Sequence, residues 1–173
     1  MFQNIPKRIK ILCFLTFINT GIAILGGVFN LISGPPDKLD ILKENLEMRG
    51  FIAQLKGLGS SNETIELIEK FQLITNAIYE NFFFYTTIST LIVFLGFFSA
   101  LLMLKQNIYG FHMYIIYSLL SSASLYLIVS PEQLPTAVIA VNLFISAIFI
   151  YLYSRNISWI KGYSNETLDN NEH

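Results

Sequence analysis

Hydrophobic positions form four long runs that contain no charged residue, and shorter polar segments separate them. The runs are 11–33, 81–104, 106–130 and 133–154. Each is at least as long as the roughly 20 residues that a helix needs to cross the hydrocarbon core of a bilayer. Lipid offers no partner for a free backbone N–H, so a spanning run of this kind is helical. The pattern predicts four transmembrane helices.

The second run continues an amphipathic segment that precedes it. In residues 62–80 the apolar side chains recur at steps of three and four, which places them on one helical face. They are Leu67, Phe71, Ile74 and Ile78. No Pro or Gly interrupts the chain from Asn62 until Gly96. The sequence therefore predicts one helix over 62–104, with its first half outside the membrane and its second half within it.

The segment 34–80 is too charged to enter lipid. Gly34-Pro35-Pro36 ends the first run, because Pro cannot continue a helix interior. Leucines at helical spacing predict a helix over about 36–56, with a break allowed at Gly50. Ser60 and Glu63 match a capping box at the start of the next helix. We expect these two amphipathic helices to pack together as a hairpin outside the bilayer.

Composition and charge exclude several classes of protein. The 173 residues are 53% hydrophobic and 13% charged, whereas soluble domains carry about 25% charged residues. A net charge of -1 provides no basic field for nucleic acid. Cys13 is the single cysteine, which excludes an internal disulfide, a dithiol redox centre and a cysteine-based zinc site. We expect Cys13 to be a small buried hydrophobe.

Neutral polar residues interrupt the apolar runs. Asn19 and Asn30 lie in the first run, and Asn142 and Ser146 lie one turn apart in the fourth. In membranes such side chains form hydrogen bonds between helices that small residues bring close together. Interhelical polar contacts are therefore the favoured interpretation of these four residues. The alternative is that they line a polar pathway.

Catalytic and metal-binding signatures are missing from the sequence. The runs contain no charged residue, and His112 has no carboxylate near it in the third run. The serines of that run have no base placed to activate them. The acidic residues of the hairpin are typical of a solvated face rather than of a cation site. They are Glu63, Glu66, Glu69 and Glu80. The sequence predicts a protein that is not an enzyme and holds no cofactor or metal.

Basic residues set the expected orientation, because cytoplasmic segments of membrane proteins are rich in Lys and Arg. One side would carry Lys7, Arg8, Lys10, Lys105, Arg155 and Lys161. On the other side, the hairpin has five basic and eight acidic residues. This predicts a cytoplasmic N-terminus (1–10), an extracytoplasmic hairpin (34–80) and a cytoplasmic tail (155–173). We expect the polar end of the tail to be disordered.

One resemblance is carried by the first run. Lys10 begins an aliphatic-Cys-aliphatic stretch, followed by Thr-Phe-Ile and the pair Gly26-Gly27. This opening resembles small uncharacterised four-helix bacterial inner-membrane proteins, and the likeness also covers the overall layout. It implies a location in a bacterial inner membrane and no known activity or site. The layout is also similar to claudin-like tetraspans, which differ in having β-rich outer loops with a cysteine pair.

These observations predict an all-α, polytopic membrane protein. Its fold is an antiparallel four-helix transmembrane bundle with an extracytoplasmic helical hairpin. The leading functional hypothesis is an accessory or scaffold subunit that binds a partner protein, or another copy of itself, through Leu67, Phe71, Ile74 and Ile78. The alternative is a small transport or lipid-binding protein that uses the neutral polar positions of the bundle. An integral membrane enzyme comes third.

Overall fold

A computed structural model describes residues 5–161 of the chain, and within them the regular elements are all helical. Three of the helices, α1, α4 and α6, are long and apolar enough to span a membrane. The elements in chain order are α1 (Lys7–Ser33), α2 (Lys38–Gly57), α3 (Asn62–Glu80), α4 (Phe82–Leu104), α5 (Ile108–Ala123), the 3₁₀ turns η1 (Ser124–Leu127) and η2 (Pro131–Gln133), α6 (Thr136–Ser154) and α7 (Ile157–Ile160).

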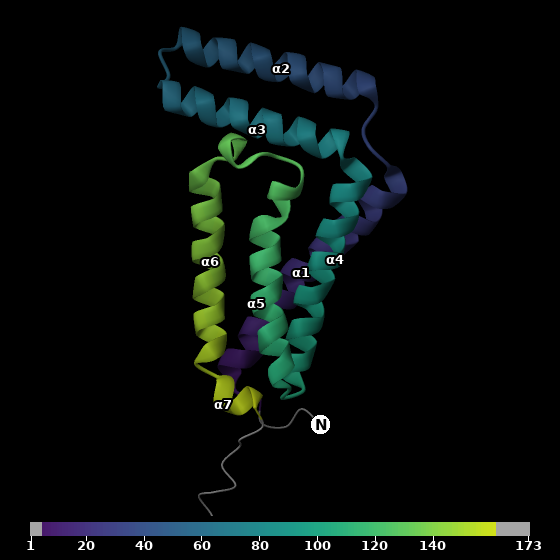
Figure 1. Cartoon of the computed structure of the whole chain (residues 1–173), viewed down its shortest axis with the longest axis vertical. Coiled ribbons are helices and arrows are strands. Elements are labelled where there is room, and N and C mark those ends of the chain that lie inside the picture. Colours follow the sequence, from purple (N-terminus) through teal and green to yellow (C-terminus); the bar gives the residue numbers. More distant parts are fainter. Residues whose placement is uncertain (1–4, 162–173) are drawn as a thin grey trace, which may run out of the picture.

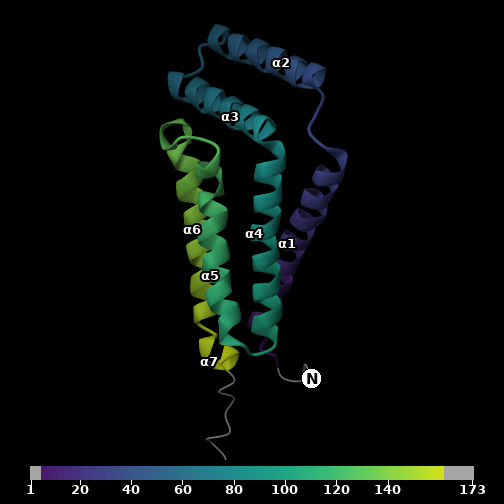
Figure 2. The same cartoon turned by 45° about the vertical axis from the view of Figure 1, so that its right-hand side comes forward.

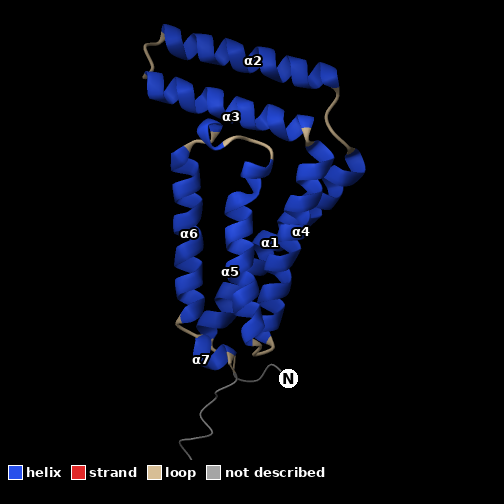
Figure 3. Cartoon of the chain, viewed as in Figure 1, coloured by secondary structure: helices blue, strands red, loops and turns tan. Residues whose placement is uncertain are grey.

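Four helices run lengthwise and two lie across one of their ends. In Figure 1, α1, α4, α5 and α6 extend along the long axis, and the antiparallel pair α2 and α3 covers one end of them. Figure 2 shows α2 outermost, with α3 between it and the lengthwise helices. The opposite end holds α7 and the start of α1. Loops are confined to the two ends, as the colouring by secondary structure shows (Figure 3).

The single helix predicted over 62–104 is wrong, because the chain turns at Asn81. α3 ends at Glu80 and α4 begins at Phe82, and between them Asn81 leaves the helical backbone region with φ -109° and ψ 27°. The Asn81 side-chain amide donates to the carbonyl of Ala77 at 3.0 Å. Asn side chains compete for backbone partners in this way and weaken helix continuity. The turn lets α3 lie across the helix ends instead of extending away from them.

The helices of the hairpin differ from the sequence expectation at their ends. α2 is continuous from Lys38 to Gly57, without a break at Gly50. The capping residue of α3 is Ser61 rather than Ser60, because the Ser61 hydroxyl accepts from the Thr64 backbone N–H at 3.3 Å. Glu63 therefore sits one position too early to complete a capping box with its cap residue. Side-chain capping of this helix was expected, but its register was wrong by one residue.

The third apolar run forms a shorter α-helix than expected. α5 covers 16 residues and continues as the 3₁₀ turn η1, so the α-helical part stops at Ala123 rather than near Ser130. The Ser122 and Ser124 hydroxyls donate to the carbonyls of Ser118 and Ser121 at 3.0 Å. Serines that bond back to the preceding turn are known to bend and weaken helices. The cluster of serines therefore marks the point where α5 tightens.

Small residues bring α1, α4 and α5 into close contact. A Cβ on Gly110 of α5 would lie 2.6 Å from both the Met103 nitrogen and the Ser99 oxygen of α4. A Cβ on Gly96 would lie 2.9 Å from the ring of Tyr117. At Gly27 of α1 it would collide with the Thr90 side chain. Such close approach through small residues is a common way for membrane helices to associate.

The main core lies toward the end of the bundle that carries α7. Its buried residues come from α1, α4, α5, α6 and α7, and they are Ile9, Leu12, Cys13, Ala100, Met103, Phe111, Tyr114, Tyr153 and Ile160. Cys13 is 1% exposed, so its predicted burial is confirmed. A second, smaller core joins Ile74 of α3 to Val129 and Leu134, which flank η2. This contact attaches the hairpin to the lengthwise helices.

The close approach of α4 and α5 predicts a strong effect of a single methyl group. We expect Gly110→Ala to lower the free energy of unfolding by about 1–3 kcal/mol, because backbone atoms of α4 cannot move aside as a flexible side chain would. Gly26→Ala is the matched control, since nothing lies within 4 Å of a Cβ there. Thermal unfolding in detergent measures both. Equal stability of the two variants would contradict the packing described.

Candidate functional site

The Tyr153 hydroxyl ties α6 to α1. The Thr16 hydroxyl of α1 and the Tyr153 hydroxyl of α6 lie 2.8 Å apart, and both residues are buried. Tyr153 also lies 3.9 Å from the Cys13 sulfur and packs against Tyr114, with ring centroids 4.8 Å apart. Thr20 does not join this contact, because its hydroxyl donates to the Thr16 carbonyl of its own helix. Tyr153 therefore attaches the last turn of α6 to α1, while Ile139 near the start of α6 packs against Val129 and Leu134.

A cleft opens beyond this hydrogen bond. It has a volume of about 530 Å³ and is bordered by α1, α5 and α6. Its uncharged polar side chains are Thr16, Asn19, Tyr114, Tyr117, Ser118, Ser121, Asn142 and Ser146. Its apolar walls are Leu15, Ile18, Ile22, Ile145 and Phe149. The volume lies within the range of about 300–1,000 Å³ that is usual for small-molecule sites.

The structure separates the four polar residues that the sequence predicted. Asn19, Asn142 and Ser146 line the cleft, where Asn19 lies beside Tyr117. Asn30 lies elsewhere, in a cavity of about 650 Å³ between α1, α3 and α4. That cavity also contains the Ser89 hydroxyl, which is buried and has no partner among the described residues. A role of these asparagines in interhelical contacts stays a prediction.

The cleft offers hydrogen bonding without charge. Asn amides and Tyr and Ser hydroxyls both donate and accept, whereas the lining contains no Lys, Arg, Asp or Glu. Such a lining suits an uncharged group with carbonyl or hydroxyl oxygens. The sequence did not single out Tyr153, whose hydroxyl bonds to Thr16 at the border of the cleft, although an aromatic hydroxyl within an apolar run was a signal for it.

The face predicted to bind a partner is divided by the structure. Ile74 is buried against Val129 and Leu134, and Ile78 packs partly against the same group. Leu67 and Phe71 continue the face beyond this contact, and they stay 38% and 44% exposed. Half of the predicted face is therefore used within the chain. It attaches α3 to the loop between α5 and α6.

A second apolar face lies on the outermost helix. Leu39, Leu42 and Leu46 of α2 are 61%, 55% and 58% exposed, at helical spacing that places them on one side. A neighbouring side of α2 contacts α3 through Asn45 and Ile52, and Ile52 is buried. α2 therefore presents three leucines that the described chain does not cover. We call these three residues the α2 leucine face.

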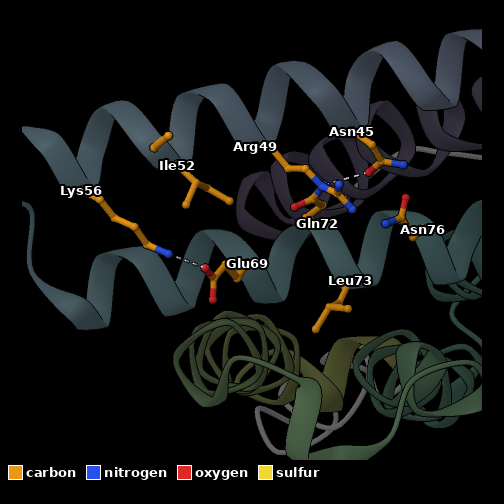
Figure 4. A pocket seen from close by; sticks show the side chains of 9 residues that line it. Asn45, Arg49, Ile52, Lys56, Glu69, Gln72, Leu73 and Asn76 are labelled. Atoms are coloured by element: carbon orange, nitrogen blue, oxygen red, sulfur yellow. Dashed lines mark hydrogen bonds and ion pairs between the residues drawn. The ribbon is translucent and has the colours of Figure 1, made fainter.

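A shallow polar groove separates α2 from α3, about 610 Å³ in volume (Figure 4). Gln72 donates to Asn45 at 2.8 Å, and Lys56 contacts Glu69 at 3.3 Å across it. Both ends of the Lys56–Glu69 pair are exposed, so its contribution to stability is small. These contacts join α2 to α3, and Lys56 and Glu69 on the groove wall are paired with each other.

A hydrogen bond near the base of the hairpin also links the two helices. The Tyr79 hydroxyl donates to the Glu44 carboxylate at 2.9 Å. Partial burial raises the pKa of Tyr79, and the hydrogen bond to the Glu44 carboxylate raises it further. On the exposed face of α3, the ion pair with Lys70 at 2.9 Å lowers the pKa of Glu66. These shifts reflect local pairing and do not mark a catalytic acid or base.

Metal-ligating side chains do not gather anywhere in residues 5–161. Groups of three or more His, Cys, Asp or Glu with suitable geometry are not found there. His112 is exposed on α5 next to the ring of Phe111. The predicted role of the hairpin glutamates as a solvated face agrees with the exposure of Glu63, Glu66, Glu69 and Glu80. The cleft and the α2 leucine face are the two features on which the functional proposal below is based.

Comparison of the chain with protein-family models, with curated proteins and with solved structures yields no match. The resemblance to small bacterial inner-membrane proteins thus stays a prediction from the sequence.

Proposed function

We propose that this protein is a non-enzymatic accessory subunit of a membrane complex. It crosses the bilayer four times and binds a partner protein through its hairpin. The three apolar helices α1, α4 and α6 supply three crossings. α5 and η1 supply the fourth, because together they extend about 32 Å, which matches a hydrocarbon core of about 30 Å. An even number of crossings leaves both termini on one side.

Charge supports the proposed orientation, with the inner end in the cytoplasm of a bacterial cell. Within residues 5–161 every acidic residue lies in the hairpin or at Glu132, which is at the same end. The other end carries six basic residues and, among the described residues, no acidic one: Lys7, Arg8, Lys10, Lys105, Arg155 and Lys161. The positive end faces the cytoplasm in most membrane proteins.

The exposure of the α2 leucine face is the observation that carries the partner-binding role. α2 is the helix farthest from the lengthwise bundle (Figure 2), so lipid tails do not cover Leu39, Leu42 and Leu46 in the proposed orientation. Apolar side chains grouped on a solvated helix and rimmed by charge are typical of protein interfaces. Leu67 and Phe71 of α3, both partly exposed, extend the apolar surface of the hairpin.

The charge of the hairpin favours a partner with a basic rim. Residues 37–80 contain eight acidic and five basic side chains, which leaves a net charge of -3. Anionic lipid headgroups and a second acidic hairpin would both be repelled by this charge. A different protein, with an apolar patch surrounded by Lys and Arg, complements it. We therefore assign the α2 leucine face to such a partner rather than to the membrane surface or to another copy.

Replacing the three leucines tests the partner-binding role. We expect Leu39→Ser/Leu42→Ser/Leu46→Ser to reduce recovery of the co-purified partner at least tenfold, while the unfolding temperature stays unchanged because these side chains are exposed. The matched control, Asp40→Ser/Lys43→Ser, removes one acidic and one basic side chain, so the net charge of the hairpin stays at -3 and only a weak surface ion pair is lost. It should retain the partner. Equal recovery in the leucine variant and in this control would contradict the proposal, as would a photocrosslink from position 42 to a second copy.

The cleft favours a second candidate function, the binding of a neutral amphiphile. Asn142 and Ser146 of α6 face Asn19 and the α5 serines across about 530 Å³, with apolar walls on either side. Unsatisfied amides and hydroxyls are costly in hydrocarbon, so an uncharged head with carbonyl and hydroxyl groups would be held there. This role uses a different part of the chain from the hairpin and is compatible with a partner-binding subunit.

A short-chain diacylglycerol is a suitable probe of this second role. We expect Asn142→Leu to weaken its binding about 2- to 10-fold, the range that one hydrogen bond supplies, with little change in stability. Asn30→Leu, in the separate cavity, should leave binding unchanged. Isothermal titration in detergent measures both variants. Absence of binding to the wild-type chain, or equal affinity in all three proteins, would exclude the cleft as a site for neutral lipids.

A further inference from the structure

Two arginines from distant parts of the chain meet at the end of the bundle opposite the hairpin. Arg8 lies in the first turn of α1, and Arg155 directly follows α6. Both line one pocket of about 280 Å³, together with Asn156. The remaining walls are Ile11, Leu12 and Leu152. The fold thus places two permanent positive charges beside an apolar surface.

Neither arginine has an acidic partner in the part of the chain that the structure describes. The three ion pairs found among those residues all lie in the hairpin, at the other end of the molecule. The Asn156 side-chain amide donates a hydrogen bond to the Leu152 carbonyl at 2.9 Å. This bond holds the Asn156 side chain at the pocket and does not involve its side-chain oxygen. Two unpaired guanidinium groups at one pocket favour an anion that can accept several hydrogen bonds.

We propose that this pocket binds the phosphate of an anionic phospholipid. The guanidinium groups of Arg8 and Arg155 donate to the phosphate oxygens, in the bidentate geometry that suits planar arginine. Ile11 of α1 and Leu152 of α6 form the apolar wall of the pocket, where they contact the start of an acyl chain, and the buried Leu12 lies behind them. This arrangement distinguishes a lipid from free phosphate, because a free ion would gain nothing from the apolar wall.

The position of the pocket along the spans fits a headgroup. α1 and α6 are both apolar enough to span, and the pocket lies where α1 begins and α6 ends. Phosphates of the inner leaflet lie at this level, and basic pockets between helices on that side are suited to anionic headgroups. The inference uses only this end of α1 and α6, so it does not depend on the partner-binding role of the hairpin.

Lipid binding is measured on the full chain purified in a neutral detergent, which removes any effect of orientation in the membrane. We expect short-chain phosphatidylglycerol to raise the unfolding temperature saturably, whereas phosphatidylcholine of the same chain length has little effect. Arg8→Gln/Arg155→Gln should weaken phosphatidylglycerol binding roughly 30-fold, the factor that about 1 kcal/mol per basic residue gives for two arginines. Arg8→Lys/Arg155→Lys keeps the charge without the planar fork and should lose less.

The control variant Lys105→Gln/Lys161→Gln removes the same charge outside the pocket and should bind within about twofold of wild type. An equal loss in this control would show that diffuse charge attracts the lipid, and the assignment of the pocket would be wrong. Saturation of the same response by inorganic phosphate alone would identify a free-anion site and overturn the lipid assignment. Equal stabilisation by phosphatidylcholine would also overturn it, because the headgroup charge would then be irrelevant.

Discussion

The inability of hydrocarbon to solvate charge is the constraint on which the rest of this structure depends. Each apolar run excludes Asp, Glu, Lys and Arg completely, so all ionisable carboxylates and amines of the described chain lie at the two ends. Within residues 5–161, acidic side chains then gather on the hairpin and at Glu132, and the charged side chains at the opposite end are all basic. Both proposed binding surfaces follow from this division. We propose a basic protein partner for the acidic hairpin and an anionic lipid for the arginine pocket.

Association of the helices within the apolar layer depends on close approach rather than on strong polar contacts. Gly110, Gly96 and Gly27 let α1, α4 and α5 pack with little space between them. α6 has no comparable contact, and its attachment to α1 includes the Thr16–Tyr153 hydrogen bond near one end. The cleft with Asn142 and Ser146 lies beside this hydrogen bond, between α1, α5 and α6.

Much of the fold was predictable because helix-forming apolar runs and Pro/Gly breaks are local signals. The helices in all four runs, the hairpin, and the burial of Cys13 follow from such signals. The turn at Asn81 was not predictable, since one Asn among good helix formers is a weak breaker and its effect depends on Ile74 packing against Val129 and Leu134. The pairing of Thr16 with Tyr153, 137 residues apart, depends on tertiary packing in the same way.

The candidate sites were predictable only in part for the same reason. Asn19, Asn142 and Ser146 were selected from the sequence as polar positions, and the structure brings them to one cleft while it places Asn30 in another. Spacing alone could not tell which apolar face of the hairpin would be covered within the chain. Ile74 is buried, whereas the α2 leucine face stays exposed. From the sequence, Arg8 and Arg155 indicated only the orientation in the membrane. That both line one pocket could be seen only in the folded structure.

Cysteine accessibility tests the central claim, four crossings with the hairpin outside, most directly. In a Cys13→Ser background, single cysteines replace Ser61, Gln106, Ser130 and Lys161, which are all exposed. A membrane-impermeant maleimide applied to right-side-out vesicles should label positions 61 and 130 and spare 106 and 161 until the membrane is permeabilised. Labelling of 106 and 130 from the same side would show that α5 does not cross, and protection of position 61 would reverse the orientation; either result would contradict the account.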